Sequence, residues 1–369
     1  MNTALTFLER HWERLALHAF GTPAELESVL LTPRFRASAH VIFLILARHS
    51  AEVVLVIKAG RRGAGAACTL AREAANLRAV HAARPDGFES IPRLITFEEY
   101  ADTPLLLETA VSGHVLKPSM ARRNPGGCAE ALLEWLTTMS AATAQRPADV
   151  APALQEQWGA PLERMVRDHP LNVEEIELVA RTRALVQPLE RASFPLVFEH
   201  GDLSAPNLLM TDRGTLNVVD WELATPAGLP GHDLFTALAF VADARAGATA
   251  FGRAFFSPRA WAKPFVERYA AHMNLAPDLL PALFVACWSK HVARQAERLQ
   301  LADSAASSSS DRWASVKAHR YFALWRHAVT HIDEIPSPSR PPARGWAPSA
   351  EPAPRHPGAP SPRAGPATS

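Results

Sequence analysis

The stretch "FEHGDLSAPNLL" (residues 198–209) ends an apolar run with a histidine and places Asp202 five positions before Asn207. It continues into "NLLMTDRGTLNVVDW" (residues 207–221), where two short apolar segments flank a polar Asp-Arg-Gly turn and predict a β-hairpin. Because the two ends of a hairpin are neighbours, we expect Asp220 to lie beside Asn207. A carboxylate and a carboxamide placed in this way suit Mg²⁺, whose remaining ligands are waters and substrate phosphates. Asp202 would then face a substrate beyond the metal, where it can orient a hydroxyl and accept its proton.

The composition is that of a soluble globular protein. The chain has 369 residues, of which 48% are apolar and 20% charged, enough for two lobes or domains and incompatible with a wholly disordered chain. Its net charge of +1 gives no field that would attract nucleic acid or an anionic membrane. Charged residues interrupt the apolar N-terminal stretch, so no signal peptide is expected, and the apolar run at 234–242 is too short to span a bilayer.

The three cysteines, Cys68, Cys128 and Cys287, lie far apart and form no CxxC pair. This spacing disfavours both a disulfide framework and a zinc site, and it is typical of a reducing compartment. We therefore expect a cytoplasmic protein without disulfides.

The order of predicted elements indicates an α+β protein. Residues 27–59 form strand-like segments rich in β-branched residues, 68–83 has helical spacing, and 92–99 and 104–111 are two further strand candidates. After Gly113 the pattern is mostly helical, with helices expected at 128–145, 172–192, 231–246, 259–273, 278–302 and 311–332.

The C-terminal tail, residues 336–369, holds eleven prolines, four arginines and a single aromatic residue, Trp346. Such a segment lacks the apolar area to offset about 1–2 kcal/mol per residue of backbone ordering, so we expect it to be disordered. Ending the chain at Ile335 should leave the melting temperature and the activity almost unchanged. A thermal melt and a turnover assay beside the full chain check this, and a melting temperature several degrees lower would show that the tail docks on the body.

Three segments together resemble the aminoglycoside phosphotransferase and choline kinase family of the protein-kinase-like fold: "HGDLSAPN", "VVDWE" and "GLPGHDL". The resemblance spans roughly residues 30–330 and implies a small, β-rich N-terminal lobe (1–109), a larger helical lobe (110–335) and a tail (336–369). It implies that Asp202 is the catalytic base, that Asn207 and Asp220 hold Mg²⁺, and that His200 positions the loop. Asp233 would begin a helix and brace the catalytic loop.

The same resemblance implies a nucleotide-gripping lobe that uses ATP. Lys58, at the end of an apolar strand, would reach the α- and β-phosphates, with Glu73 on the following helix as its ion-pair partner. The backbone around Glu108 to Val111 resembles the hinge that binds adenine. The phosphate-covering loop would fall at 32–43, which contains no glycine, and there Ser38 is the candidate phosphate contact.

Several alternatives remain open on the sequence. The leading hypothesis is an ATP-dependent kinase that phosphorylates a hydroxyl of a sugar, an amino alcohol or an antibiotic. A catalytically silent kinase-like binding protein is the second, motivated by the glycine-free loop, and a metal-dependent phosphoester hydrolase using His200 and Asp202 is the third. Glu222 is either a second metal contact or a charge neutralised by a nearby base. The sequence leaves the acceptor and the oligomeric state unassigned.

The late helices lean against a polycationic acceptor, because their basic residues outnumber their acids. These basic residues are Lys290, His291, Arg294, Arg298, Arg312, Lys317, Arg320 and Arg326.

Overall fold

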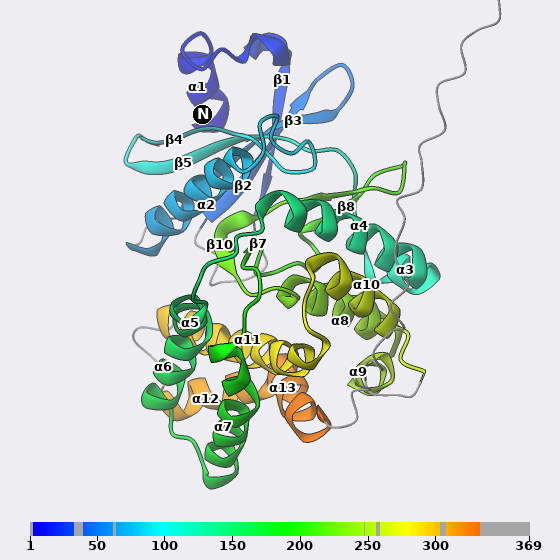
Figure 1. Ribbon diagram of the computed structural model, residues 1–369. Coiled ribbons are helices and arrows are strands. Elements are labelled where there is room, and N and C mark those ends of the chain that lie inside the picture. Colours follow the sequence, from blue (N-terminus) through cyan, green and yellow to red (C-terminus); the bar gives the residue numbers. More distant parts are fainter. Residues whose placement is uncertain are drawn as a thin grey trace, which may run out of the picture. The chain divides into compact units, whose positions relative to one another are not determined.

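The computed structural model describes residues 3–32, 40–61, 64–246, 248–255, 259–302 and 308–332 (Figure 1). Two of the expectations above, the phosphate contact at Ser38 and the disorder of the tail from residue 336, lie outside these residues.

The N-terminal part is an antiparallel sheet whose strands follow the order β1-β2-β3-β5-β4. Its strands are β1 (Leu26–Leu31), β2 (His40–Ala47), β3 (Glu52–Gly60), β4 (Leu94–Tyr100) and β5 (Thr103–Thr109). Helix α2 (Ala64–Ala82) connects β3 to β4, and α1 (Thr3–His11) precedes the sheet. The strands expected from β-branched runs are therefore present, in the expected chain order.

The two helices cover opposite faces of this sheet. Side chains alternate along a strand, so Leu105 and Leu107 point to one face of β5 and Leu106 points to the other. The first two join the buried cluster that contains Phe7 of α1, whereas Leu106 packs with Leu70 of α2.

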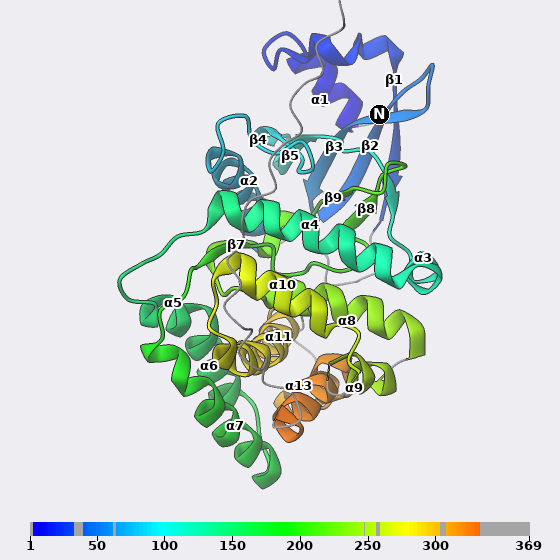
Figure 2. The same cartoon turned by 45° about the vertical axis from the view of Figure 1, so that its right-hand side comes forward.

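The C-terminal part is mostly helical, and its largest buried cluster forms around α4, α8 and α11. Figure 2 shows α4 lying along α8 and α10, which both contact it. Its helices are α3 (Pro118–Arg123), α4 (Pro125–Thr143), α5 (Ala151–Leu154), α6 (Ala160–Asp168), α7 (Val173–Val186), α8 (His232–Ala246), α9 (Ala248–Phe255), α10 (Lys263–Met273), α11 (Leu280–Ala302), α12 (Ser309–Ala318) and α13 (Arg320–Thr330).

Short strands carry the loops between these helices. β8 (Leu208–Met210) and β9 (Leu216–Val218) form the expected hairpin, with Leu208 opposite Val218, and β6 (His114–Val115) pairs with β8. β7 (Val197–Glu199) pairs with β10 (Thr225–Gly228). The hairpin therefore connects the loop after β7 to the loop before β10, as its sequence predicts.

Some helix boundaries differ from the sequence expectation. The single helix expected at 311–332 is interrupted at His319, whose side chain caps α13 by accepting from Tyr321 N at 3.4 Å. The helix expected at 172–192 becomes a 3₁₀ turn from Gln187, because Pro188 has no N–H for the α-helical ladder. Helices α5 and α6 were not expected at all; a π-helical turn at Gln155–Gly159 joins them and breaks their apolar periodicity.

The α+β class, a β-rich part followed by a larger helical part, is confirmed. The lobe boundaries at 109 and 335 stay a prediction. Every helix within the described ranges is too short or too polar to cross a bilayer.

Candidate active site

The loop between β7 and β8 carries Asp202 and Asn207, and hydrogen bonds between its own residues stabilise its conformation. Asp202 Oδ1 accepts a hydrogen bond from Ser204 Oγ at 3.1 Å. Asn207 Nδ2 donates to the carbonyl of Asp202 at 3.1 Å and also reaches Asp202 Oδ2 at 3.4 Å. Because the amide nitrogen of Asn207 is used within the loop, its oxygen is the atom that can ligate a metal.

Asp233 accepts two hydrogen bonds from the backbone at the start of this loop. It lies buried in the first turn of α8, where Oδ2 accepts from His200 N at 2.7 Å and Oδ1 from Gly201 N at 2.9 Å. Gly201 has φ +85°, and a Cβ there would come within 2.6 Å of the carbonyl oxygen of Leu223, so the tight bend requires glycine. The geometry agrees with the bracing role expected for Asp233.

His200 links the same loop to the hairpin. Asp202 N donates to His200 Nδ1 at 3.3 Å, so the proton of the neutral ring lies on Nε2, which donates to Val219 O at 3.0 Å. The ring is fully buried against the edge of Trp221, with ring centroids 4.9 Å apart. These contacts join the loop that carries Asp202 to the residue before Asp220, and the supporting role of His200 stays a prediction.

Asp220 lies next to Asn207, as the hairpin predicts. Val219 N donates to Asn207 O at 3.0 Å, which continues the hairpin beyond its paired residues. Asp220 itself adopts the left-handed conformation, with φ +68° and ψ +70°, which is uncommon for a residue other than glycine and is a feature of strained functional loops. Its Oδ1 has no hydrogen-bond partner among the described residues.

Lys58 lies among three carboxylates. It forms an ion pair with Glu73 Oε1, and its Nζ lies 3.5 Å from Glu108 Oε1 and 3.9 Å from Asp220 Oδ1. Burial alone would lower the pKa of Lys58, but the carboxylates of Glu108, Glu73 and Asp220 raise it above its usual value. Lys58 is therefore a fixed positive charge between the sheet and the loop after β9.

Glu108 takes a position that the hinge expectation did not include. Its backbone is paired with both β3 and β4, and its side chain points to Lys58. Burial, only partly offset by Lys58, raises the pKa of Glu108 to about 8. The next amides, of Thr109 and Ala110, donate to Arg93 O and Val54 O. Val111, partly buried just beyond the strand, is the part of the expected hinge that leaves the sheet.

Helix α2 joins the Lys58 group to the metal-binding candidates. Glu73 Oε1 also accepts from Trp221 N at 3.1 Å, and Asn76 Nδ2 donates to the carbonyls of Trp221 and Ala224 at 2.9 and 3.0 Å. These bonds fix the residues that follow Asp220 against the N-terminal part. A shift of α2 would therefore move Lys58 and Asp220 relative to each other.

The donor set beside Asp220 fits a hard divalent cation. The Asp220 carboxylate with its unpartnered buried Oδ1, together with the Asn207 carboxamide, supplies the oxygen ligands that Mg²⁺ prefers. Glu222 lies on the 3₁₀ turn directly after Asp220, where burial and the charges of Asp220 and Glu73 raise its pKa to about 7. Both interpretations of Glu222 stay open, because Asp220 and Arg298 both act on its carboxylate.

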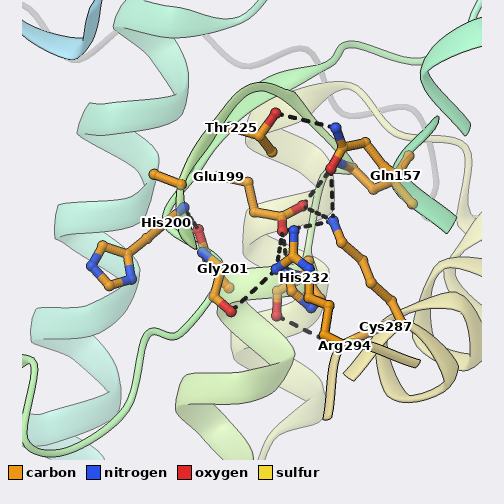
Figure 3. Close-up of polar contacts among 12 residues, drawn as sticks. Gln157, Glu199, His200, Gly201, Thr225, His232, Cys287 and Arg294 are labelled. Atoms are coloured by element: carbon orange, nitrogen blue, oxygen red, sulfur yellow. Dashed lines mark hydrogen bonds and ion pairs between the residues drawn. The ribbon is translucent and has the colours of Figure 1, made fainter. Parts of the chain in front are cut away.

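The sequence analysis did not predict a buried ionic network around Glu199, just before the loop that carries Asp202. Lys290 Nζ of α11 donates to both carboxylate oxygens of Glu199, the last residue of β7, at 2.7 and 2.9 Å. Glu199 Oε2 also accepts from Leu229 N at 3.2 Å. Arg294 lies 3.5 Å from both Glu199 Oε1 and Gly201 O. In Figure 3, Glu199 lies between His200 and Gly201 on one side and Gln157 on the other. An acid inside an apolar run, "PLVFEHG", was the one signal that could have revealed it.

Charge balance explains why this network is stable inside the protein. Burial alone would raise the pKa of Glu199, but His232 and Lys290 hold it well below its usual value. Burial lowers the pKa of His232. Burial beside Arg294 also lowers the pKa of Lys290, to about 8, which leaves it mostly charged at neutral pH.

Solved structures with the same fold share little sequence with this chain. The choline kinase LicA from Streptococcus pneumoniae is 10% identical, with a TM-score of 0.52 over 88% of this chain and 99% of that one. A GDP complex of aminoglycoside 2'-phosphotransferase-IIIa is 15% identical, with a TM-score of 0.51 over 87% of this chain and 98% of that one. At these identities the likeness shows the fold alone. Comparison with curated proteins finds no significant match.

The family itself is given by a sequence match. The model of the phosphotransferase enzyme family, APH, matches residues 36–269, which include the end of β3, the catalytic loop, the hairpin and the start of α8. This confirms the resemblance that the three motif segments carry, and it confirms the expectation of a phosphotransferase with a kinase-like fold. The chain belongs to the phosphotransferase enzyme family.

Proposed function

We propose that this protein is an ATP-dependent small-molecule kinase that transfers the γ-phosphoryl group to a hydroxyl. One observation carries the proposal: Lys58, Asp220, Asn207 and Asp202, from separate parts of the chain, form one connected set. Lys58 lies 3.9 Å from Asp220, Val219 next to Asp220 bonds to Asn207, and Asn207 bonds to Asp202. Such a series of a cation, metal ligands and a base is what phosphoryl transfer requires.

In this proposal each residue has one task. Lys58 binds the α- and β-phosphates, and the chain around Val111 binds adenine. Asn207 and Asp220 hold Mg²⁺, which when bound would neutralise charge on the transferred phosphoryl group. Asp202, which is half-buried, orients the acceptor hydroxyl and takes its proton. Ser38 would complete the phosphate contacts from the segment before β2.

The acceptor side of Asp202 contains α11 and the start of α13. Burial and the Asp202 carboxylate raise the pKa of Tyr321, and Arg294 lies 3.5 Å from Gly201 O. At least three of the eight bases on the late helices pair with acids: Lys290 and Arg294 with Glu199, and Lys317 with Glu175 at 3.0 Å. Arg294 remains beside the loop, and we therefore propose a neutral or anionic sugar, amino alcohol or antibiotic as acceptor.

ATP consumption against a panel of hydroxyl metabolites tests this function. Turnover of at least one neutral or anionic alcohol with Mg²⁺ is the expected result. Binding of ATP without turnover on any alcohol would favour the silent kinase-like protein, which the glycine-free segment at 32–43 still motivates. Release of phosphate from phosphoesters without ATP would favour the hydrolase instead.

Asp220→Ala should abolish Mg²⁺-dependent ATP binding, because this carboxylate is the main protein charge on the ion. Titration calorimetry with ATP, with and without Mg²⁺, measures the effect. Asp212→Ala is the matched control, since Asp212 lies at the hairpin turn with its side chain 97% exposed. Metal-dependent binding that survives in Asp220→Ala would place the ion elsewhere.

A further inference from the structure

His232, Cys287 and His291 form a buried cluster of three metal-ligating side chains where α8 begins beside α11. They are 2%, 1% and 5% exposed. One ligand atom from each residue lies within 4.8 Å of the other two. The sequence disfavoured a zinc site because the cysteines are isolated along the chain, but the fold supplies two histidines beside one of them.

The ring of His232 is oriented as a metal ligand would be. Its Nδ1 lies 2.7 Å from Glu199 Oε1, although the two atoms do not form a hydrogen bond. No hydrogen-bond partner within the described residues reaches Nε2, although this atom is fully buried. Histidines that bind metals commonly present their other ring nitrogen to a carboxylate, which fixes the tautomer and leaves the ligating nitrogen with a free lone pair. Nε2 of His232 therefore has the environment of a ligand and no other use in the described structure.

The other two ligands come from one face of α11, because Cys287 and His291 are four residues apart on a helix. Thr236 lies between the helices, with its hydroxyl 2.8 Å from His291 Nε2 and donating to His232 O at 2.9 Å. If His291 binds through Nδ1, this hydroxyl remains its supporting partner.

The donor types select the ion. One soft thiolate and two imidazoles suit Zn²⁺, and the two acids nearest the cluster, Glu199 and Asp233, balance the two bases, Lys290 and Arg294. Burial lowers the pKa of both histidines, which favours the neutral rings that bind metal. Burial raises the pKa of the Cys287 thiol well above its usual value, so this thiol is protonated until a metal displaces the proton.

We propose that His232, Cys287 and His291 bind one Zn²⁺ ion that ties the first turn of α8 to α11. The Cys287 thiol gives its proton to solvent as the sulfur–zinc bond forms. The site lies next to Asp233, which holds the amides of His200 and Gly201, so an ion here would stiffen the support of the catalytic loop. This proposal does not depend on which acceptor is phosphorylated.

The test uses the full-length protein, freed of metal by a chelator and titrated with Co²⁺ and then Zn²⁺. Co²⁺ should produce the near-ultraviolet charge-transfer band of a thiolate–cobalt bond, and Zn²⁺ should remove it at about one ion per chain. Zn²⁺ should also raise the melting temperature by at least a few degrees and release a proton. Absence of the thiolate band from the wild-type protein would overturn the proposal.

Paired cysteine variants identify the ligand. Cys287→Ser should lose the cobalt band and the zinc-dependent stabilisation, whereas Cys128→Ser, which alters another buried thiol outside the cluster, should keep both. Loss in Cys128→Ser with retention in Cys287→Ser would contradict the assignment. If Cys287→Ser does not fold, His291→Gln and protection of the wild-type thiol from alkylation by Zn²⁺ give the same decision: an unprotected Cys287 would refute the site.

Discussion

Asp202→Ala should reduce ATP-dependent turnover by about two orders of magnitude or more while nucleotide affinity stays almost unchanged, because the carboxylate acts on the acceptor hydroxyl and not on the nucleotide. In the loop, the Asp202 carboxylate accepts hydrogen bonds from Ser204 Oγ and Asn207 Nδ2. Both of these donors remain in the variant. Single-turnover kinetics with an accepted alcohol, beside calorimetric ATP binding, separate the two quantities.

Asp202→Asn is the informative companion variant. It keeps a side chain of the same size for Ser204 and Asn207 to contact, but it cannot take a proton. Its turnover should be as low as that of the alanine variant if the role is that of a base. Recovery of most of the activity in Asp202→Asn, or collapse of ATP affinity with turnover preserved in Asp202→Ala, would contradict this role.

Lys290→Met should lower the free energy of unfolding by about 3–5 kcal/mol, because it leaves the carboxylate of Glu199 buried with its closest cationic partner removed. Both side chains are fully buried, and the pair is joined by contacts of 2.7 and 2.9 Å. Denaturant unfolding followed by circular dichroism measures the loss. The methionine has a similar volume, so a cavity contributes little to the change.

A pair with a more exposed lysine gives the control for this prediction. Lys317→Met breaks the ion pair with Glu175, in which the lysine side chain is 38% exposed, and should cost only about 0–1 kcal/mol. The double variant Glu199→Gln with Lys290→Met should recover part of the loss, because it removes the uncompensated charge. Equal effects of Lys290→Met and Lys317→Met would mean that the Glu199 network does not support the catalytic loop energetically.

The local parts of the candidate site could be predicted from the sequence. The hairpin that brings Asp220 beside Asn207 depends on residues 207–221 alone, where apolar segments and a tight turn set the register. Lys58 and Glu73 could be placed because a strand end and the following helix lie close in the chain, and α2 connects directly to β3. Periodicity and turn residues are enough to predict contacts between elements that are adjacent in the chain.

Only the tertiary structure decided which distant groups meet. Glu199 and Lys290 are 91 residues apart, and nothing in their local sequences says that β7 ends beside α11. The Glu108 side chain faces Lys58 because β5 pairs with β3. Strand patterns alone do not specify this pairing. Cys287 looked isolated because ligand spacing was judged along the chain, whereas packing of α8 against α11 sets which side chains share a buried space. In each case the reason is the same: a sequence pattern specifies which face of an element is buried, but not the partner that covers it.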